Sequence, residues 1–150
     1  MQIQLSTEFA LHGLLYLARH QRRQPVQLAE IAAATKVKES YLRKLFQNLV
    51  KAGILDAYKG SSGGYSLKTS PEEISFYDVL KAIEGEPGFM RCYSDRRGCG
   101  LHPDCPVKTG FAQAFDSFTE RLKGVTLAEI LKTTDPQDRK TEWLNQAAIT

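Results

Sequence analysis

Residues 28 to 67 carry two short helical patterns followed directly by a hairpin pattern, and this order leaves few folds open. Leu28 and Ile31 mark a short helix that ends near Thr35. After a turn of about four residues, a second amphipathic pattern follows, and Gly53 stands where a C-terminal glycine belongs. The inward positions of that second pattern are Leu42, Leu45, Phe46 and Leu49. Two short helices joined by a tight turn are the layout of a helix-turn-helix.

The hairpin pattern consists of two β-prone runs around a glycine-rich link. Residues 54–58 and 65–67 are the runs, and residues 59–64 read Lys-Gly-Ser-Ser-Gly-Gly. Directly behind a helix-turn-helix, such a hairpin is a wing.

The rest of the chain reads as further helices and one loop. A first helix is expected from about Thr7 to His20 with Ser6 as its cap, and Ser75 with Asp78 resembles a capping box. A long helix is expected from about residue 107 to 122, and Thr126 with Glu129 suggests a second capping box. The predicted fold class is therefore mainly α with a small β-hairpin wing, a winged helix-turn-helix plus a long dimerisation helix.

We divide the chain into four parts. Residues 1–84 form the DNA-binding domain, and residues 85–106 form a loop that holds four glycines, three prolines and all three cysteines. Residues 107–132 form the dimerisation helix and a following short helix. Residues 133–150 form a polar tail whose order the pattern does not show.

Basic charge is concentrated in the helix-turn-helix half. From Arg19 to Lys68 there are ten Lys/Arg and three Asp/Glu, whereas from Thr69 onward there are ten against thirteen. Such asymmetry favours a polyanionic partner. A basic helix face alone is usually only a solvated face. Here the tight helix pair, the wing and the charge coincide, and together they predict binding to double-stranded DNA.

The expected DNA contacts lie at the start of the second helix of the pair and at the hairpin tip. Lys and Arg pair with guanine, Gln pairs with adenine, and backbone amides bind phosphates. The predicted contacts are Ser40, Tyr41, Arg43, Lys44, Gln47, Lys59, Gly60, Ser61, Ser62 and Gly63.

Length and composition exclude several classes. The chain has 150 residues, of which 42% are hydrophobic and 25% charged, which is ordinary for one compact domain. It shows no apolar run long enough to span a bilayer and no export signal, so we expect a cytoplasmic protein without a membrane partner. No phosphate loop, dinucleotide fingerprint or serine–histidine–acid motif is present, so we do not expect an enzyme.

The three cysteines follow the spacing C-x6-C-x5-C, at Cys92, Cys99 and Cys105. This spacing lacks the close CxxC pairs of structural zinc sites. Three thiolates can hold an iron–sulfur cluster, which normally takes four protein ligands. The fourth could be His102, Glu8 or His12, or could come from a partner subunit. Three unligated thiols are the alternative.

Four apolar residues form a stripe along the long helix. A core role is the common explanation for such a stripe. The winged helix, however, uses most of its own apolar residues, so we expect the stripe to meet the same helix of a second chain. The predicted dimer interface is Phe111, Phe115, Phe118 and Leu122. A two-fold homodimer would match a palindromic operator.

Several of these segments resemble the IscR/NsrR family of bacterial winged-helix regulators. The resemblance rests on Ser40-Tyr41-Leu42, Gly53, the run from Gly60 to Leu67, and the three-cysteine loop before a long helix. It covers Met1 to about Lys132. It implies a homodimer with crossing long helices and an iron–sulfur cluster, 4Fe-4S or 2Fe-2S, on Cys92, Cys99 and Cys105, whose loss or modification changes DNA affinity.

The chain departs from the family pattern at three positions. IscR-type proteins have a histidine three residues after the last cysteine, where this chain has Lys108. NsrR-type proteins are similar through Ser6-Thr7 and carry an aspartate where this chain has Glu8. The resemblance therefore favours a carboxylate from the partner subunit's first helix as fourth ligand and leaves His12 open. Lys59 stands in place of the usual wing arginine and lacks its flat fork.

Together these observations predict a dimeric DNA-binding transcription regulator, a repressor, whose iron–sulfur cluster senses nitric oxide, redox state or iron–sulfur supply. The alternative is a winged-helix regulator without a cluster, controlled by a partner protein or a thiol metabolite. A module whose basic face docks on an acidic protein is a third reading.

Overall fold

The computed structural model describes residues 2–86, 105–135 and 137–146. In this part of the chain the elements are mostly helical, with one two-stranded antiparallel sheet. In chain order they are α1 (Leu5–Arg19), η1 (Gln21–Arg23), α2 (Leu28–Thr35), α3 (Glu39–Lys51), β1 (Leu55–Tyr58), β2 (Gly64–Leu67), α4 (Phe76–Glu84), α6 (Pro106–Gly124), α7 (Leu127–Thr133) and η2 (Glu142–Leu144). The predicted fold class is confirmed. None of the helices described here is long and apolar enough to cross a membrane.

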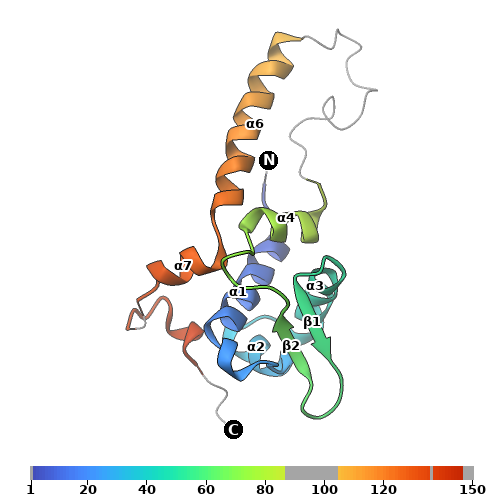
Figure 1. Ribbon diagram of the computed structural model, residues 1–150, viewed down its shortest axis with the longest axis vertical. Coiled ribbons are helices and arrows are strands. Elements are labelled where there is room, and N and C mark those ends of the chain that lie inside the picture. Colours follow the sequence, from blue (N-terminus) through green and yellow to red (C-terminus); the bar gives the residue numbers. More distant parts are fainter. Residues whose placement is uncertain (1, 87–104, 136, 147–150) are drawn as a thin grey trace.

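Helix α1 runs through the centre of the winged helix-turn-helix and packs against α2, α3 and α4 (Figure 1). Its core residues Ala10, Leu14 and Leu17 are fully buried. A Cβ on Gly13 would lie 2.7 Å from two ring atoms of Phe46, so the bare glycine lets α1 and α3 approach closely. The predicted inward face of α3 is buried as expected.

The start of α1 differs from the prediction. The helix begins at Leu5 with Gln4 as its N-cap residue, so Ser6 lies inside the helix and the prediction that Ser6 caps it is wrong. Gln4 makes no side-chain cap of its own. Instead, the Gln4 N–H donates to Glu84 Oε1 over 2.8 Å, a bond between residues 80 positions apart. A local pattern cannot reveal such a cap.

The hairpin is anchored to the segment that leads into α2. Strands β1 and β2 pair from Leu55 with Leu67 to Tyr58 with Gly64. Tyr65 also exchanges two backbone hydrogen bonds with Val26, of 3.0 and 2.9 Å. Gly64 permits this contact, because a Cβ there would lie 2.2 Å from the Val26 carbonyl oxygen. The wing is thus fastened to the helix-turn-helix at its second strand.

After the hairpin, α4 and α7 pack on the winged helix, whereas α6 between them extends away from it (Figure 1). The predicted capping box of α4 is confirmed, with Ser75 and Asp78 bonded reciprocally. Helix α6 extends away from the winged helix, and α7 comes back to pack on α1 (Figure 1). Of the second predicted capping box, the structure shows the Thr126 half, in which the Thr126 hydroxyl accepts from the Glu129 N–H over 3.1 Å.

The described part of the polar tail packs on the winged helix. Leu144 in η2 is only 1% exposed and belongs to the main core. Its carbonyl oxygen lies 2.9 Å from His20 Nε2, and Tyr16 Oη lies 2.5 Å from the Gln146 carbonyl oxygen. Residues near 144 therefore complete the core that α1 and α2 begin.

Candidate nucleic-acid interface

The outer face of α3 presents polar and basic side chains to solvent. Leucine and phenylalanine occupy the buried side at helical spacing, which forces the intervening positions outward. All five α3 residues predicted to contact DNA are exposed: Ser40, Tyr41, Arg43, Lys44 and Gln47. This arrangement brings two cations and three hydrogen-bonding groups to one accessible surface.

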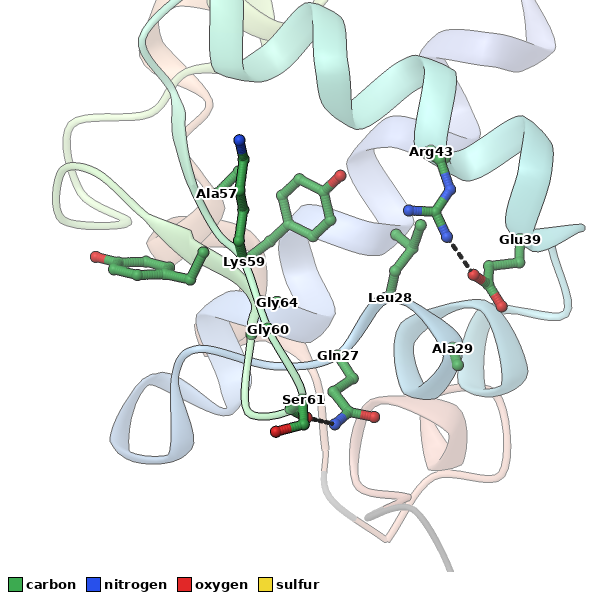
Figure 2. Close-up of a pocket in the computed structure, with 13 residues that line it drawn as sticks. Gln27, Leu28, Ala29, Glu39, Arg43, Ala57, Lys59, Gly60, Ser61 and Gly64 are labelled. Carbon is green, nitrogen blue, oxygen red and sulfur yellow. Dashed lines mark hydrogen bonds and ion pairs between the residues drawn. The ribbon is translucent and has the colours of Figure 1, made fainter.

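An open groove of about 520 Å³ separates the start of α3 from the hairpin tip, which we define as residues 59–63. Glu39 and Arg43 line its helix side, and Lys59, Gly60 and Ser61 line its hairpin side (Figure 2). The groove thus brings Arg43 of the helix together with Lys59, Gly60, Ser61 and Gly63 of the hairpin, which are five of the predicted DNA contacts. We call it the wing groove.

Two polar contacts order the wing groove. Arg43 Nη2 lies 2.5 Å from Glu39 Oε1, one helical turn away, so the pair is an exposed ion pair (Figure 2). At the groove's base, Gln27 Nε2 donates to the Ser61 carbonyl oxygen over 2.9 Å (Figure 2). The prediction did not include Glu39 or Gln27. The spacing of Glu39 four residues before Arg43 was the available signal.

The remaining tip residues differ in accessibility. Lys59, Gly60, Ser61 and Ser62 are exposed, whereas Gly63 is buried in the turn. The Gly63 N–H donates to the Gly60 carbonyl oxygen over 3.1 Å, so that amide is already used within the hairpin.

The two candidate ligands on α1 lie one turn apart, and both are exposed. The His12 ring packs edge-on against Trp143 with centroids 5.2 Å apart. Partial burial there lowers the pKa of His12, against a smaller opposing effect of Glu8. Together with Arg139 and Glu142, these rings line a small pocket of about 280 Å³.

Only part of the predicted cysteine site falls in the described residues. Cys105 is the N-cap residue of α6 and is half-buried. Cys92, Cys99 and His102 lie outside the described residues. Within the described ranges, no three His, Cys, Asp or Glu side chains gather as a metal site would require. Cys105, Glu8 and His12 of one chain therefore do not form such a group by themselves.

The predicted dimer stripe on α6 is unevenly exposed. Phe111 is 46% exposed, whereas Phe115 is only 8% exposed within the single chain. Phe118 and Leu122 are half-buried. Val107, one turn before Phe111, is exposed as well. The accessible apolar surface of α6 thus lies toward its N-terminal half.

A comparison with protein-family models matches most of the chain. The model described as "Rrf2: Iron-dependent Transcriptional regulator" matches residues 3–133. The chain belongs to the Rrf2 family. It is therefore a transcriptional regulator, and the resemblance to IscR- and NsrR-type proteins is confirmed.

Individual relatives and solved structures agree with Rrf2 membership. The regulator NsrR of Geobacillus kaustophilus is 30% identical over 133 residues, covering 88% of this chain and 90% of the relative. The regulator IscR of Pectobacterium carotovorum is 30% identical over 138 residues, covering 92% and 84%. These relatives are named as helix-turn-helix transcriptional regulators, which agrees with the expectation that the chain is not an enzyme.

Two solved Rrf2-type structures share the fold. CymR, described as the global cysteine regulator of B. subtilis, superposes with a TM-score of 0.75 at 26% identity and covers 90% of this chain and 99% of its own. IscR of T. potens superposes with a TM-score of 0.71 at 27% identity, covering 90% and 89%. One of these two neighbours is thus described as a regulator of cysteine.

Proposed function

We propose that this Rrf2 protein binds an operator with the start of α3 in the major groove and the hairpin tip on the adjacent backbone or minor groove. The observation that carries the proposal is the wing groove, which sets Arg43, on the exposed face of α3, beside the hairpin tip. An α-helix fits the major groove, where Arg or Lys pairs with guanine and Gln with adenine. Lys44 and Gln47 have the chemistry for this readout.

The test compares two exposed lysines. The probe is a duplex that the wild-type chain enriches from a random pool, with random duplex as reference. Lys44→Ala on α3 should weaken binding to the enriched duplex by about 5- to 150-fold, the range for a good base contact. Lys132→Ala on α7, which removes the same charge from an exposed site outside the helix-turn-helix and the hairpin, should change it little. Equal losses in both variants, or none in Lys44→Ala, would contradict the proposed docking.

The binding unit is a homodimer formed through α6, and its two-fold symmetry requires a palindromic operator. Support comes from the exposed apolar side chains Val107 and Phe111 on a helix that extends from the core. Phe111→Glu should give a monomer by sedimentation at micromolar concentration. Gln113→Glu introduces the same charge at an exposed position on the opposite helix face and should stay dimeric. A dimer that persists in Phe111→Glu would contradict this interface.

The cysteines fit an iron–sulfur cluster by the chemistry of their donors. Thiolates are the ligands such clusters take, Cys105 is partly accessible at the start of α6, and the family is described as iron-dependent. When bound, a cluster supplies a group that reacts with nitric oxide or oxidants. Cys92, Cys99 and Cys105 would hold it, with Glu8 of the partner subunit as fourth ligand. His12 is less suited, since its ring packs against Trp143 of its own chain.

A regulatory role for α1 follows from its contacts. Phe9 lies next to Glu8 and packs its ring edge-on against Tyr41, with centroids 6.1 Å apart. A displacement of the first turn of α1 would therefore reach the start of α3. In this reading the chain acts as a repressor whose DNA affinity depends on the state of the cysteines.

The second candidate is a cluster-free regulator controlled by a thiol metabolite or a partner protein. The similarity to CymR, described as a cysteine regulator, favours it. An absorption spectrum with iron and sulfide analysis of protein purified without oxygen separates the two. Matching iron and sulfide that Cys99→Ala abolishes would support the cluster. A colourless, iron-free protein even after reconstitution would support the thiol reading.

Within the cluster reading, Glu8→Gln tests the fourth ligand. We expect it to lower the iron content or the lifetime of the bound iron. Glu72→Gln, an exposed carboxylate on a loop, is the matched control and should retain the wild-type iron content. Equal iron retention in both variants would exclude Glu8 as a ligand.

A further inference from the structure

The N-terminus of α1 accepts a cap from Glu84, the last residue of α4. Glu84 Oε1 accepts from the Gln4 N–H over 2.8 Å and from Thr7 Oγ1 over 2.5 Å. Thr7 is only 2% exposed, so its bond to Glu84 is largely shielded from water, whereas the Gln4 bond is exposed. A negative charge is also favourable at a helix N-terminus. Glu84 therefore replaces the cap that the residues around Gln4 do not provide.

This cap connects two parts of the chain that the proposed mechanism needs to link. Glu84 is the last residue of α4, and the segment that carries Cys92 and Cys99 follows it in sequence. On the other side, Thr7 directly precedes Glu8 and Phe9 on α1. Phe9 in turn contacts Tyr41 near the start of α3. A continuous series of contacts thus runs from the end of α4 to the DNA-facing helix.

The end of α4 is itself fixed from a second side. Lys81 Nζ lies 2.9 Å from Glu86 Oε2, and Tyr77 Oη donates to Glu86 Oε1 over 3.2 Å. Lys123 of α6 lies 5.3 Å from the centroid of the Tyr77 ring. Of the two glutamates at the end of α4, Glu86 thus contacts residues of α4 itself, whereas Glu84 contacts residues at the start of α1.

We propose that Glu84 is a positioning residue, which sets the first turn of α1 and, through Phe9, the approach of α3 to DNA. The inference rests on the proposed DNA binding by α3. Without the carboxylate, the Gln4 N–H and the buried Thr7 hydroxyl lose their shared acceptor, and the first turn of α1 loosens. The start of α3 then loses a fixed neighbour at Tyr41.

The first arm of the test measures α1 without DNA. Glu84→Ala should speed amide hydrogen exchange in residues 4–8, first of all at Gln4, whose N–H loses its acceptor, while Glu84→Gln, which keeps an acceptor oxygen, should restore most of the protection. Glu86→Ala removes a carboxylate that contacts Lys81 and Tyr77 of α4, and should leave exchange at residues 4–8 unchanged. Unchanged exchange in Glu84→Ala would overturn the capping role, whether or not the chain binds DNA.

The second arm measures binding to the enriched duplex against random duplex. Glu84→Ala should reduce the preference for the enriched duplex about 5-fold or more, within the usual range of coupling between sites. In a Phe9→Ala background, which removes the link to α3, the same substitution should have little further effect. Additive losses would show that Glu84 acts on stability alone and would overturn the proposal.

Two further outcomes separate the hypotheses. If the wild-type chain enriches no duplex, the proposed function fails, and the exchange arm alone decides the capping role. If Glu84→Ala does not fold, Thr7→Val removes one of the two donors at nearly constant volume. It should then reproduce a smaller loss of preference for the enriched duplex, and an unchanged preference would overturn the proposal.

Discussion

Gly64→Ala tests the attachment of the wing to the helix-turn-helix. A Cβ at this position would lie 2.2 Å from the Val26 carbonyl oxygen and 2.5 Å from its carbonyl carbon. Both are backbone atoms, so no side-chain rotation can relieve the overlap. The strand must move away from Val26, and the two hydrogen bonds between Val26 and Tyr65 must break or stretch.

The expected loss can be worked from these contacts. Each backbone hydrogen bond contributes about 0.5–1.5 kcal/mol net. An alanine held at the φ of +153° found at Gly64 adds strain on the order of 1–3 kcal/mol. With two such bonds at risk, we therefore expect the free energy of unfolding to fall by about 2–6 kcal/mol. For a domain of this size, Tm should fall by on the order of 10 °C.

Gly110→Ala is the matched control for this experiment. Gly110 lies inside α6, and a Cβ there would meet no atom within 4 Å. Helix propensity alone then predicts a gain of about 0.5–1 kcal/mol. Both substitutions restrict the unfolded chain equally, so the difference reports the folded state. Urea and thermal unfolding followed by circular dichroism measure both. A Gly64→Ala protein as stable as Gly110→Ala would refute the reasoning.

Three further outcomes can be checked with the same protein. Glu39→Gln removes the acidic partner of Arg43 from the wing groove and should tighten binding to random duplex, because one repulsive charge is lost; weaker binding in a salt titration would contradict this. Leu144→Ala should cost about 2–5 kcal/mol in urea unfolding, as a truncation in a packed core does, whereas a cost below about 1 kcal/mol would mean that η2 is not part of that core. Burial against Trp143 lowers the pKa of His12, so the unfolded chain binds more protons below about pH 6.5 and stability should fall as the pH drops through that value. His12→Gln should make the urea midpoint less dependent on pH over this window, and an unchanged dependence would exclude His12 as its source.

Much of the fold follows from local patterns in the sequence. The inward face of α3, the hairpin and the Ser75–Asp78 capping box each depend on residues within a few positions of one another. Helical spacing alone also decides which side chains of α3 are exposed. These features were therefore predictable without knowledge of the tertiary structure.

The features that sequence reasoning missed depend on distant partners. Ser6 has the chemistry of a cap, but Glu84 reaches the helix start from 80 residues away. Leu144 stands in a polar stretch, so its burial against α1 has no periodic signal. In the candidate site, the burial of Gly63 follows from the close fold of the hairpin turn. The arrangement of Cys92 and Cys99 stays a prediction.

The docking of η2 on α1 has a consequence for synthesis. Tyr16 and Gln146 are neighbours in the fold although 130 residues separate them in the chain. Translation proceeds from the N-terminus at roughly 5–20 residues per second. The helix-turn-helix is therefore synthesised several seconds before the segment around Leu144, which packs against its core. A nascent chain must keep that apolar surface from aggregating until the segment around Leu144 leaves the ribosome.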